Sequence, residues 1–574
     1  MIVIHHRWNR IRLIVYLGFL FKTMIAKLLN FKTKTITFAA IVLASSALLS
    51  RCLGMLRDNL LANLLSKSQT DIYFSAFRIP NFVYGILISG GIIAAFLPVF
   101  SAEFKKSKEH AWELTNNVLT FFLIALIVVS FILAIFTPQL IDLLVPGFNA
   151  FQKSQTIVLT RIMFLSPILL GVSSIFSGIL QYSNLFLAYS LTPIFYNIGI
   201  IFGIVVFLPL CNFDLKALAY GIILGAFLHL SVQIIPCIKS GFHPRFSFNF
   251  RHLGLQKIFR LMIPRTIGAG AFHLNLIVIT SIASTLSPGS ISIFNFSNNL
   301  QGLPIGLIGV SFATAAFPVF SRHFIQEQKE EFSKKFFLIF SQVLFLIIPL
   351  SFFIFLLRAQ IVRLVLGTAI VGDGLFGWWQ TRLTAACLGI FCIALFANCL
   401  IPLLTRTFYS LHNTKTPVKI AVFSVILNIV LCYSFINILE SSSFIQERMI
   451  NFLKLRGIQD ISIIGLPLAL SISSLIQFVL LLTFLKKKIK ILDFKKIYKS
   501  VLKILIATFF MGVVVYIGLQ VSSMLLPMDK VLGILLQIFM ATILGILSYS
   551  FFSLLLKCRE PRIIWSSVLT QFKK

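Results

Sequence analysis

The sequence predicts an all-α integral membrane protein of about 14 transmembrane helices, with two parallel six-helix lobes and two extra C-terminal helices. Hydrophobic residues make up 58% of the 574 residues, whereas charged residues make up only 12%. A soluble domain of this length would need far more polar surface. Apolar runs of roughly 20 residues recur along the chain, and a helix of that length crosses the ~30 Å hydrocarbon core of a bilayer.

Short polar segments separate the apolar runs. In the first half we expect spans at about residues 36–56, 70–100, 112–137, 155–181, 187–209, 215–237 and 258–286. In the second half we expect them at about residues 290–320, 333–357, 380–410, 417–438, 461–485, 501–525 and 531–556.

An internal repeat groups these spans. The segment YFSAFRIPNFVYGILISGGIIAAFLPVFS at residues 73–101 aligns without a gap with IFNFSNNLQGLPIGLIGVSFATAAFPVFS at 293–321. Chance similarity of apolar segments is the alternative, but Phe, Pro and Ser recur in register. A repeat of six spans gives two copies of the same orientation, as in transporters built from parallel repeats. The predicted domains are an N-lobe at 36–237, a C-lobe at 238–485 and a helix pair at 486–556.

The basic residues avoid every second loop. A net charge of +33 could suit a nucleic-acid-binding protein, but its distribution is typical of membrane topology. We therefore expect both termini in the cytoplasm and no nucleic-acid partner. The segment KKKIKILDFKKIYK at 486–499 suits the anionic head groups of membrane lipids, with a docking site for a protein partner as the alternative.

The two ends of the chain are expected to lie outside the bilayer core. Residues 1–35 are apolar but interrupted by Lys22 and Lys27, and they lack a small-residue cleavage site. Either Met24 is the true start, or this extension lies on the inner membrane surface as an amphipathic segment. Residues 557–574 form a cytoplasmic tail.

No motif indicates covalent chemistry. The chain has no GxxxxGK[ST] loop, no GxSxG elbow, no CxxC pair and no HExxH pair. We therefore expect no enzyme activity, no metal and no cofactor. The eight cysteines are expected to be apolar filler.

Charged residues inside the apolar runs are the candidate functional residues. Arg51 and Asp58 lie seven residues apart in the first span, so they share one helix face, with Gly54 near it. A cation at mid-bilayer costs roughly 2.5–3.5 kcal/mol on insertion scales, so such residues face a bundle interior or a water-filled cavity.

Three further arginines extend this set. Arg57 is near the end of the first span, Arg78 precedes Pro80, and Arg265 follows Pro264 in the seventh span. Four cations facing one cavity predict an anionic substrate, and phosphate fits guanidinium best. Snorkelling to the interface, or neutralising Asp58 and Asp71, is the alternative for the arginines near span ends.

Four segments resemble a known family. SRCLGMLRDNLL, TDIYFSAFRIPN, AAFLPVFSAEF and FYSLHNTKTPVKIA are similar to the signature segments of the MurJ (MviN) lipid II flippases, within the multidrug/oligosaccharidyl-lipid/polysaccharide exporter superfamily. The resemblance covers about residues 36–556. It implies a fourteen-helix transporter in the bacterial inner membrane that turns undecaprenyl-diphosphate-linked disaccharide-pentapeptide (lipid II) to the outer leaflet for peptidoglycan synthesis.

The resemblance also carries site residues and partners. It matches Arg51, Arg57 and Asp71 to the family's cavity charges, and it implies that the last two spans form a groove for the lipid tail. Lipid II and membrane lipids are the implied partners, and contact with the cell-wall synthesis machinery stays open.

Two departures from the family pattern reduce the cavity charge. Where the family often has arginines, this chain has Tyr84 and Gly85 in the second span and Asn299 in the eighth. Arg265 is a candidate replacement for them. The seventh and eleventh spans lack a carboxylate for a sodium or proton site, so the coupling ion stays open.

Two other functions share part of this pattern. A flippase for another polyprenyl-diphosphate-linked oligosaccharide would need the same cationic cavity. A drug or solute exporter is disfavoured, because cationic drugs suit carboxylates and this chain offers arginines.

Overall fold

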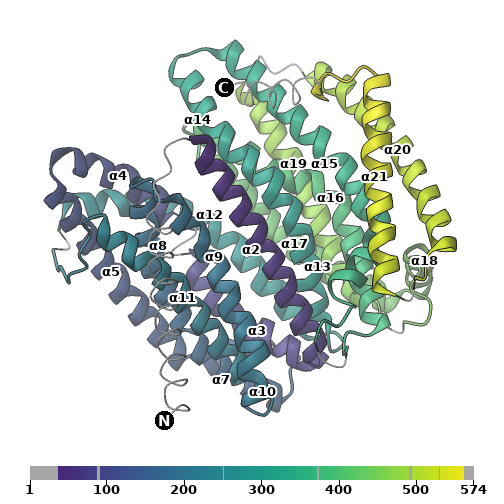
Figure 1. Ribbon diagram of the computed structural model, residues 1–574, viewed down its shortest axis with the longest axis horizontal. Helices are drawn as coiled ribbons and strands as arrows, with labels where there is room; N and C mark the ends of the chain where they lie inside the picture. The colour runs from purple at the N-terminus through teal and green to yellow at the C-terminus, as the bar shows by residue number, and fades with distance from the viewer. Residues whose placement is uncertain are drawn as a thin grey trace, which may run out of the picture. The chain divides into compact units, whose positions relative to one another are not determined.

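The computed structural model describes residues 36–86, 91–249, 251–371, 374–458, 460–489, 494–528 and 530–561. These residues are helical almost throughout and contain no strand, which confirms the predicted all-α class (Figure 1). Among them, 11 helical segments are long and apolar enough to cross a membrane. The figure of about 14 crossings therefore stays a prediction. Met24 and the rest of the N-terminal extension lie outside the described residues.

The helices form two compact units. The first contains residues up to Arg57, Ser75–Asp142 and Ala150–His273, and the second contains Asp58–Phe74, Leu143–Asn149 and the chain from Leu274 onward. The helices of the first part of the chain are α2 (Ile36–Leu64), α3 (Lys67–Tyr84), α4 (Ile92–Lys106), α5 (Lys108–Ile135), α6 (Thr137–Leu144), α7 (Ala150–Met163), α8 (Leu165–Tyr182), α9 (Phe186–Phe202), η2 (Gly203–Phe207), α10 (Leu208–Leu210), α11 (Lys216–Lys239) and α12 (Leu253–Ser284).

The first unit packs around α8, which contacts α4, α5, α9 and α11. Its core is rich in aromatic side chains. The rings of Phe96 and Phe100 stack at 5.1 Å, and Tyr182 meets Phe100 edge to face at 4.9 Å. Such aromatic pairs add about 0.5–1.5 kcal/mol each beyond the area they bury.

Paired glycines bring α9 and α11 into close contact. Gly199 and Gly203 in α9 and η2 face Gly225 and Gly221 in α11, and a Cβ added to Gly203 would lie 2.4 Å from the Cα of Gly221. Each pair forms a GxxxG pattern, the small-residue arrangement that lets membrane helices approach closely. This contact was not predicted from the sequence.

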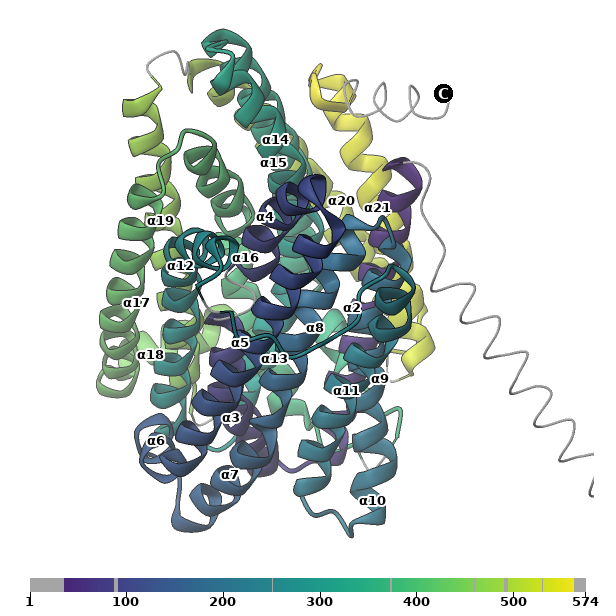
Figure 2. The same ribbon diagram turned by 90° about the vertical axis from the view of Figure 1, so that its left-hand side faces the viewer.

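The second unit packs around α16. Its helices are α13 (Ser290–Pro304), η3 (Ile305–Val310), α14 (Ser311–Ile325), α15 (Lys329–Val365), α16 (Trp378–Ser410), α17 (Lys415–Ser441), α18 (Ser443–Leu453), η4 (Ser462–Ile464), α19 (Gly465–Lys488), α20 (Phe494–Leu525) and α21 (Val531–Leu555). The helices α13, α14, α15 and α19 all contact α16. Figure 2 shows α17 beside α19, and α20 pairs with α21 and with α15.

The repeat detected in the sequence is visible in the helices. The chain widens into a π turn at Gly85 and Ile86, and the repeat-matched segment η3 is a π-helix that begins at Ile305. Each is followed by a 15-residue helix with an internal proline, Pro98 in α4 and Pro318 in α14. The central helices α8 and α16 also occupy matching positions in the order of predicted spans.

Several predicted spans differ from the helices observed. The eighth predicted span is one continuous helical segment, Ser290–Ile325, and it contains the π-helix η3 directly after Pro304, which lacks a backbone donor. In the second span, α3 ends at Tyr84 and a π turn follows at Gly85 and Ile86. The ninth span was predicted to end at residue 357, whereas α15 continues to Val365 and includes Arg358 and Arg363. The helix α18 was not predicted.

Candidate substrate-binding site

Asn197 in α9 fixes the position of Arg57 in α2. Nη1 of Arg57 donates to Oδ1 of Asn197 at 3.3 Å. The amide of Asn197 in turn donates to the backbone and side-chain oxygens of Ser50, both at 3.2 Å. A side-chain hydrogen bond between membrane helices contributes about 0.6 kcal/mol, up to about 2. Arg57 therefore projects from a face of α2 that is held against α9.

Arg51 lies on the same helix, six residues before Arg57, and is half-buried. No described heavy atom lies within 4 Å of a Cβ added to Gly54, so the helix surface between the two arginines has room beside it. Within the first unit, α2 thus carries two cations next to an uncrowded glycine, which is an arrangement that can accept an anion.

Arg78 and His273 form a second polar cluster in the first unit. Arg78 is buried in α3, with 8% of its surface exposed, and its charge acts on the imidazole of His273 in α12. The imidazole lies directly over Gly85, where a Cβ would be 1.9 Å from Nε2 of His273. His273 therefore occupies the space that any side chain at position 85 would need. Gly85 stands out in the sequence as a departure from the family pattern, whereas no sequence pattern points to His273.

Asp58 and Asn299 are hydrogen-bonded to each other. Nδ2 of Asn299 in α13 donates to Oδ2 of Asp58 at 2.9 Å, and Asp58 is 6% exposed. At the next position of α2, Nδ2 of Asn59 donates to the carbonyl oxygens of Val365 and Thr368 at 2.8 and 2.7 Å. The end of α2 is thereby attached to the end of α15.

Asp71 caps a helix from outside it. Its two carboxylate oxygens accept hydrogen bonds from the backbone N–H groups of Gly289, at 2.6 Å, and Ser292, at 2.8 Å, in the first turn of α13. A carboxylate at a helix N-terminus is stabilised by the unpaired N–H groups and by the helix dipole. Asp71, predicted from family resemblance to line the cavity, has a contact that stabilises the fold.

Arg265 lies within α12, but its side chain is outside the part of the structure that is described. Its predicted role as a replacement cation stays a prediction.

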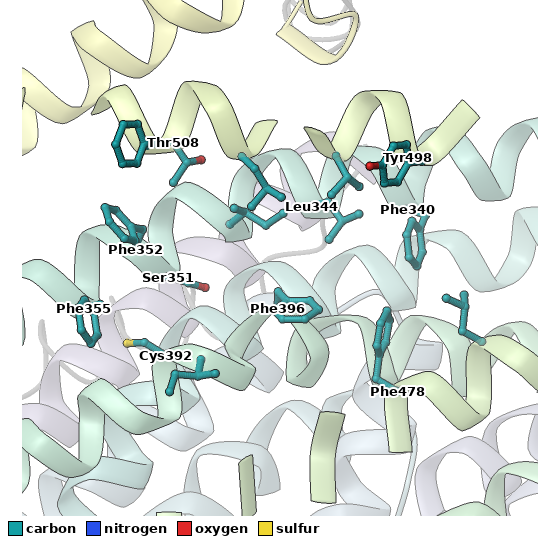
Figure 3. Close-up of a pocket in the computed structure, with 16 residues that line it drawn as sticks. Phe340, Leu344, Ser351, Phe352, Phe355, Cys392, Phe396, Phe478, Tyr498 and Thr508 are labelled. Carbon is teal, nitrogen blue, oxygen red and sulfur yellow. The ribbon is translucent and has the colours of Figure 1, made fainter. Parts of the chain in front are cut away.

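An apolar cavity of about 760 Å³ opens in the second unit, between α15, α16, α19 and α20 (Figure 3). Six phenylalanines line it: Phe340, Phe352, Phe355, Phe396, Phe478 and Phe509. The few polar side chains on its wall are Ser351, Cys392, Tyr498 and Thr508. The family resemblance assigned a lipid-tail groove to the last two spans, whereas these lining residues come from α20 and three helices of the predicted C-lobe.

Two intramembrane arginines were missed in the sequence. Arg406 in α16 donates from Nη1 to Oγ1 of Thr314 in α14. Arg358 in α15 packs against the Phe355 ring. The first lies at the end of a predicted span and the second just past one, where polar residues lower the local hydropathy and hide the continuation of the helix.

Among the described residues, no group of three or more His, Cys, Asp or Glu side chains is placed to hold a metal ion. The helices α12 and α17 meet instead through two neutral amides, with Nδ2 of Asn428 donating to Oδ1 of Asn275 at 2.7 Å. Asn197 and Asn428 each lie in the fifth predicted span of their lobe, and each is hydrogen-bonded to the first predicted span of that lobe.

Solved structures resemble this arrangement of helices. A lipid II flippase MurJ in an inward closed conformation superposes with a TM-score of 0.69 at 22% identity, covering 89% of this chain and 99% of that one. An inward-facing multidrug resistance MATE family transporter of the MOP superfamily gives 0.62 at 14% identity, covering 79% of this chain and 98% of that one. At these identities the likeness concerns the fold.

Curated relatives match over most of their length. A probable lipid II flippase MurJ of Buchnera aphidicola subsp. Acyrthosiphon pisum is 28% identical over 524 residues, which is 88% of this chain and 96% of the relative. The lipid II flippase MurJ of Burkholderia cenocepacia is 28% identical over 393 residues, which is 67% of this chain and 75% of the relative. The model of the family described as lipid II flippase MurJ matches residues 61–536. With more than half of its length matched, this chain belongs to the lipid II flippase MurJ family.

Proposed function

We propose that this protein moves lipid II, the undecaprenyl-diphosphate-linked disaccharide-pentapeptide, from the inner to the outer leaflet of the bacterial cytoplasmic membrane, for peptidoglycan synthesis. The observation that carries the proposal is the pair Arg51 and Arg57 in the apolar helix α2 of a chain of this family. A guanidinium in a membrane helix is costly unless it meets water or an anion, and its planar donors match phosphate oxygens.

The proposed diphosphate site is built from arginines. Arg51 and Arg57 bind the diphosphate, with Arg78 and Arg265 as further cations. Asp58 and Asn299, which are hydrogen-bonded to each other in the second unit, are proposed as further polar contacts of the substrate. Asp71 is left out of this set, since both of its oxygens serve the backbone of α13.

The proposed function also assigns roles to the apolar cavity, to the two lobes and to the termini. The polyprenyl tail occupies the apolar cavity of α15, α16, α19 and α20. The lobes at 36–237 and 238–485 alternate access to the site, both termini are cytoplasmic, and the cycle needs no bound cofactor. Membrane lipids surround the helices.

Genetic replacement tests this function. The gene is expressed in a bacterium whose own lipid II flippase can be switched off, and growth and cell shape are followed after depletion. Rescue by the wild-type chain is expected. Failure to rescue by a chain that reaches the membrane at normal level would favour another polyprenyl-diphosphate-linked oligosaccharide or an exported solute.

A further inference from the structure

The apolar cavity is elongated along α15. Its lining residues on that helix run from Phe340 to Phe355, a rise of about 22 Å at 1.5 Å per residue. Figure 3 shows Phe340, Phe478 and Tyr498 at one end and Phe355 and Cys392 at the other. The cavity therefore has the shape of a channel for an extended chain, with two distinct ends.

Arg358 lies at the end marked by Phe355 and Cys392. Its guanidinium carbon is 4.7 Å from the centroid of the Phe355 ring. Its stem crosses Gly389, which is one helical turn before Cys392 in α16, and a Cβ on Gly389 would lie 2.8 Å from Cδ of Arg358. Phe355, against which the arginine packs, lines the cavity, and so does Cys392, whose thiol lies close enough to interact with the arginine charge.

The guanidinium has donors to spare. Nη1 donates to the carbonyl oxygen of Phe355 at 2.8 Å, and in the described part of the chain it has no further hydrogen bond and no ion pair. Arg358 is half-buried in α15, which carries no carboxylate after Glu331, although Gln360 and Arg363 lie close to it along the helix. A guanidinium carries five N–H donors, and leaving a cation in such a place without an anion is costly.

An apolar channel that ends at a cation fits a lipid with an anionic head. We propose that Arg358 binds the diphosphate of a polyprenyl lipid whose tail fills this cavity, as a second phosphate contact of the transport cycle. This inference rests on the proposed function. Charge complementarity selects the head group, and the length and apolar wall of the channel select a single long chain.

The contributions of the lipid head group and of the tail can be measured separately by comparing how three lipids bind to the purified full-length protein. The probes are undecaprenyl diphosphate, the neutral undecaprenol of equal length, and phosphatidylglycerol, an anionic diacyl lipid. Each variant is made in an Arg51→Ala, Arg57→Ala background, so that the site of the proposed function contributes little. Native mass spectrometry in detergent measures the dissociation constants.

The background protein should bind the diphosphate about 10- to 100-fold more tightly than undecaprenol, as expected for one charge-assisted contact. Arg358→Gln should remove that preference and leave undecaprenol binding unchanged, and Arg358→Lys should keep part of it. Gly389→Ala should weaken it, because the new methyl group displaces the arginine stem. Leu344→Trp, which fills the cavity, should weaken both prenyl lipids alike.

Arg363→Gln is the matched control, because Arg363 lies on the same helix but packs against the ring of Trp378. An unchanged preference in Arg358→Gln, or an equal loss in Arg363→Gln, would overturn the inference. If phosphatidylglycerol binds as tightly as undecaprenyl diphosphate, the inference that a polyprenyl lipid occupies the cavity would be wrong. A wild-type chain that shows this binding but fails the replacement test would refute the proposed function and leave the assignment of Arg358 standing.

Discussion

At the scale of single residues, the sequence reveals where charges lie but not what they contact. Arg51 and Asp71 both stand out as charged residues within or beside apolar runs. In the structure, Arg51 is half-buried on α2, whereas Asp71 caps α13 through backbone atoms more than 200 positions away in the chain. No local pattern predicts such a long-range contact. His273 was missed for the same reason, since only its place over Gly85 gives it significance.

Replacing Arg51 should weaken substrate binding without harming the fold. Arg51→Ala removes a cation that is costly in a membrane, so membrane abundance should not fall. Loss of one charge-assisted contact of roughly 1.5–3 kcal/mol should weaken lipid II binding by about one to two orders of magnitude. Arg51→Lys should recover only part, because an ammonium lacks the planar two-pronged fit. Dissociation constants of the purified variants provide the measurement, and wild-type affinity in Arg51→Ala would transfer the role to other arginines.

Replacing Asp71 should lower the stability of the protein, in contrast to replacing Arg51. Asp71→Ala leaves the N–H groups of Gly289 and Ser292 without their acceptor, which should destabilise the protein by about 0.5–2 kcal/mol, the usual cost of a lost helix cap. Asp71→Asn should be milder. Thermal unfolding in detergent measures the effect. A melting temperature equal to that of the wild type would show that this contact is dispensable.

At the scale of elements, hydropathy finds the helices but not their interruptions. The π turns in the second and eighth spans are not visible in the hydropathy pattern, because their residues are as hydrophobic as those of a regular helix. The glycines of α9 and α11 are plain in the sequence, but their partners become visible only when Gly199 meets Gly225 and Gly203 meets Gly221. Small residues therefore carry packing information that composition cannot show.

Enlarging the glycine contact should separate α9 from α11. A Cβ on Gly203 would lie 2.4 Å from the Cα of Gly221, a backbone atom that cannot move aside alone. Gly203→Leu should cost at least about 1–3 kcal/mol, the usual penalty of overpacking, and lower the amount of protein in the membrane. Gly302→Ala is the control, since no described heavy atom lies within 4 Å of its added Cβ. Equal abundance of the two variants on quantitative blots would contradict this view of the contact.

At the scale of the whole molecule, the internal repeat was the most informative sequence feature. The π turns that follow α3 and α13, which were not predicted, fall at positions that the repeat alignment matches. Composition alone was enough for the all-α membrane class. The lipid-tail groove of the last two spans stays a prediction. The walls of the apolar cavity come from helices distant in sequence, and α15, α16 and α19 supply most of its lining.

Cysteine labelling tests the predicted topology. Cys211 is exposed in the connection after α10, which the distribution of basic residues places on the outer side. An impermeant thiol reagent added to cells with an opened outer barrier should label Cys211. In a Cys211→Ser background, Lys105→Cys and Lys488→Cys should resist the reagent until the membrane is permeabilised. Labelling of either engineered cysteine in intact cells would contradict the predicted orientation.

The central claim is that this chain carries lipid II across the membrane by means of Arg51. The most direct measurement is the fraction of lipid II that an impermeant probe reaches in the outer leaflet, in cells depleted of their own flippase. Expression of the wild-type chain should restore that fraction, and an equally abundant Arg51→Ala variant should not. Lipid II that stays inaccessible with the wild-type chain, or that reaches the outer leaflet equally well with Arg51→Ala, would contradict the account.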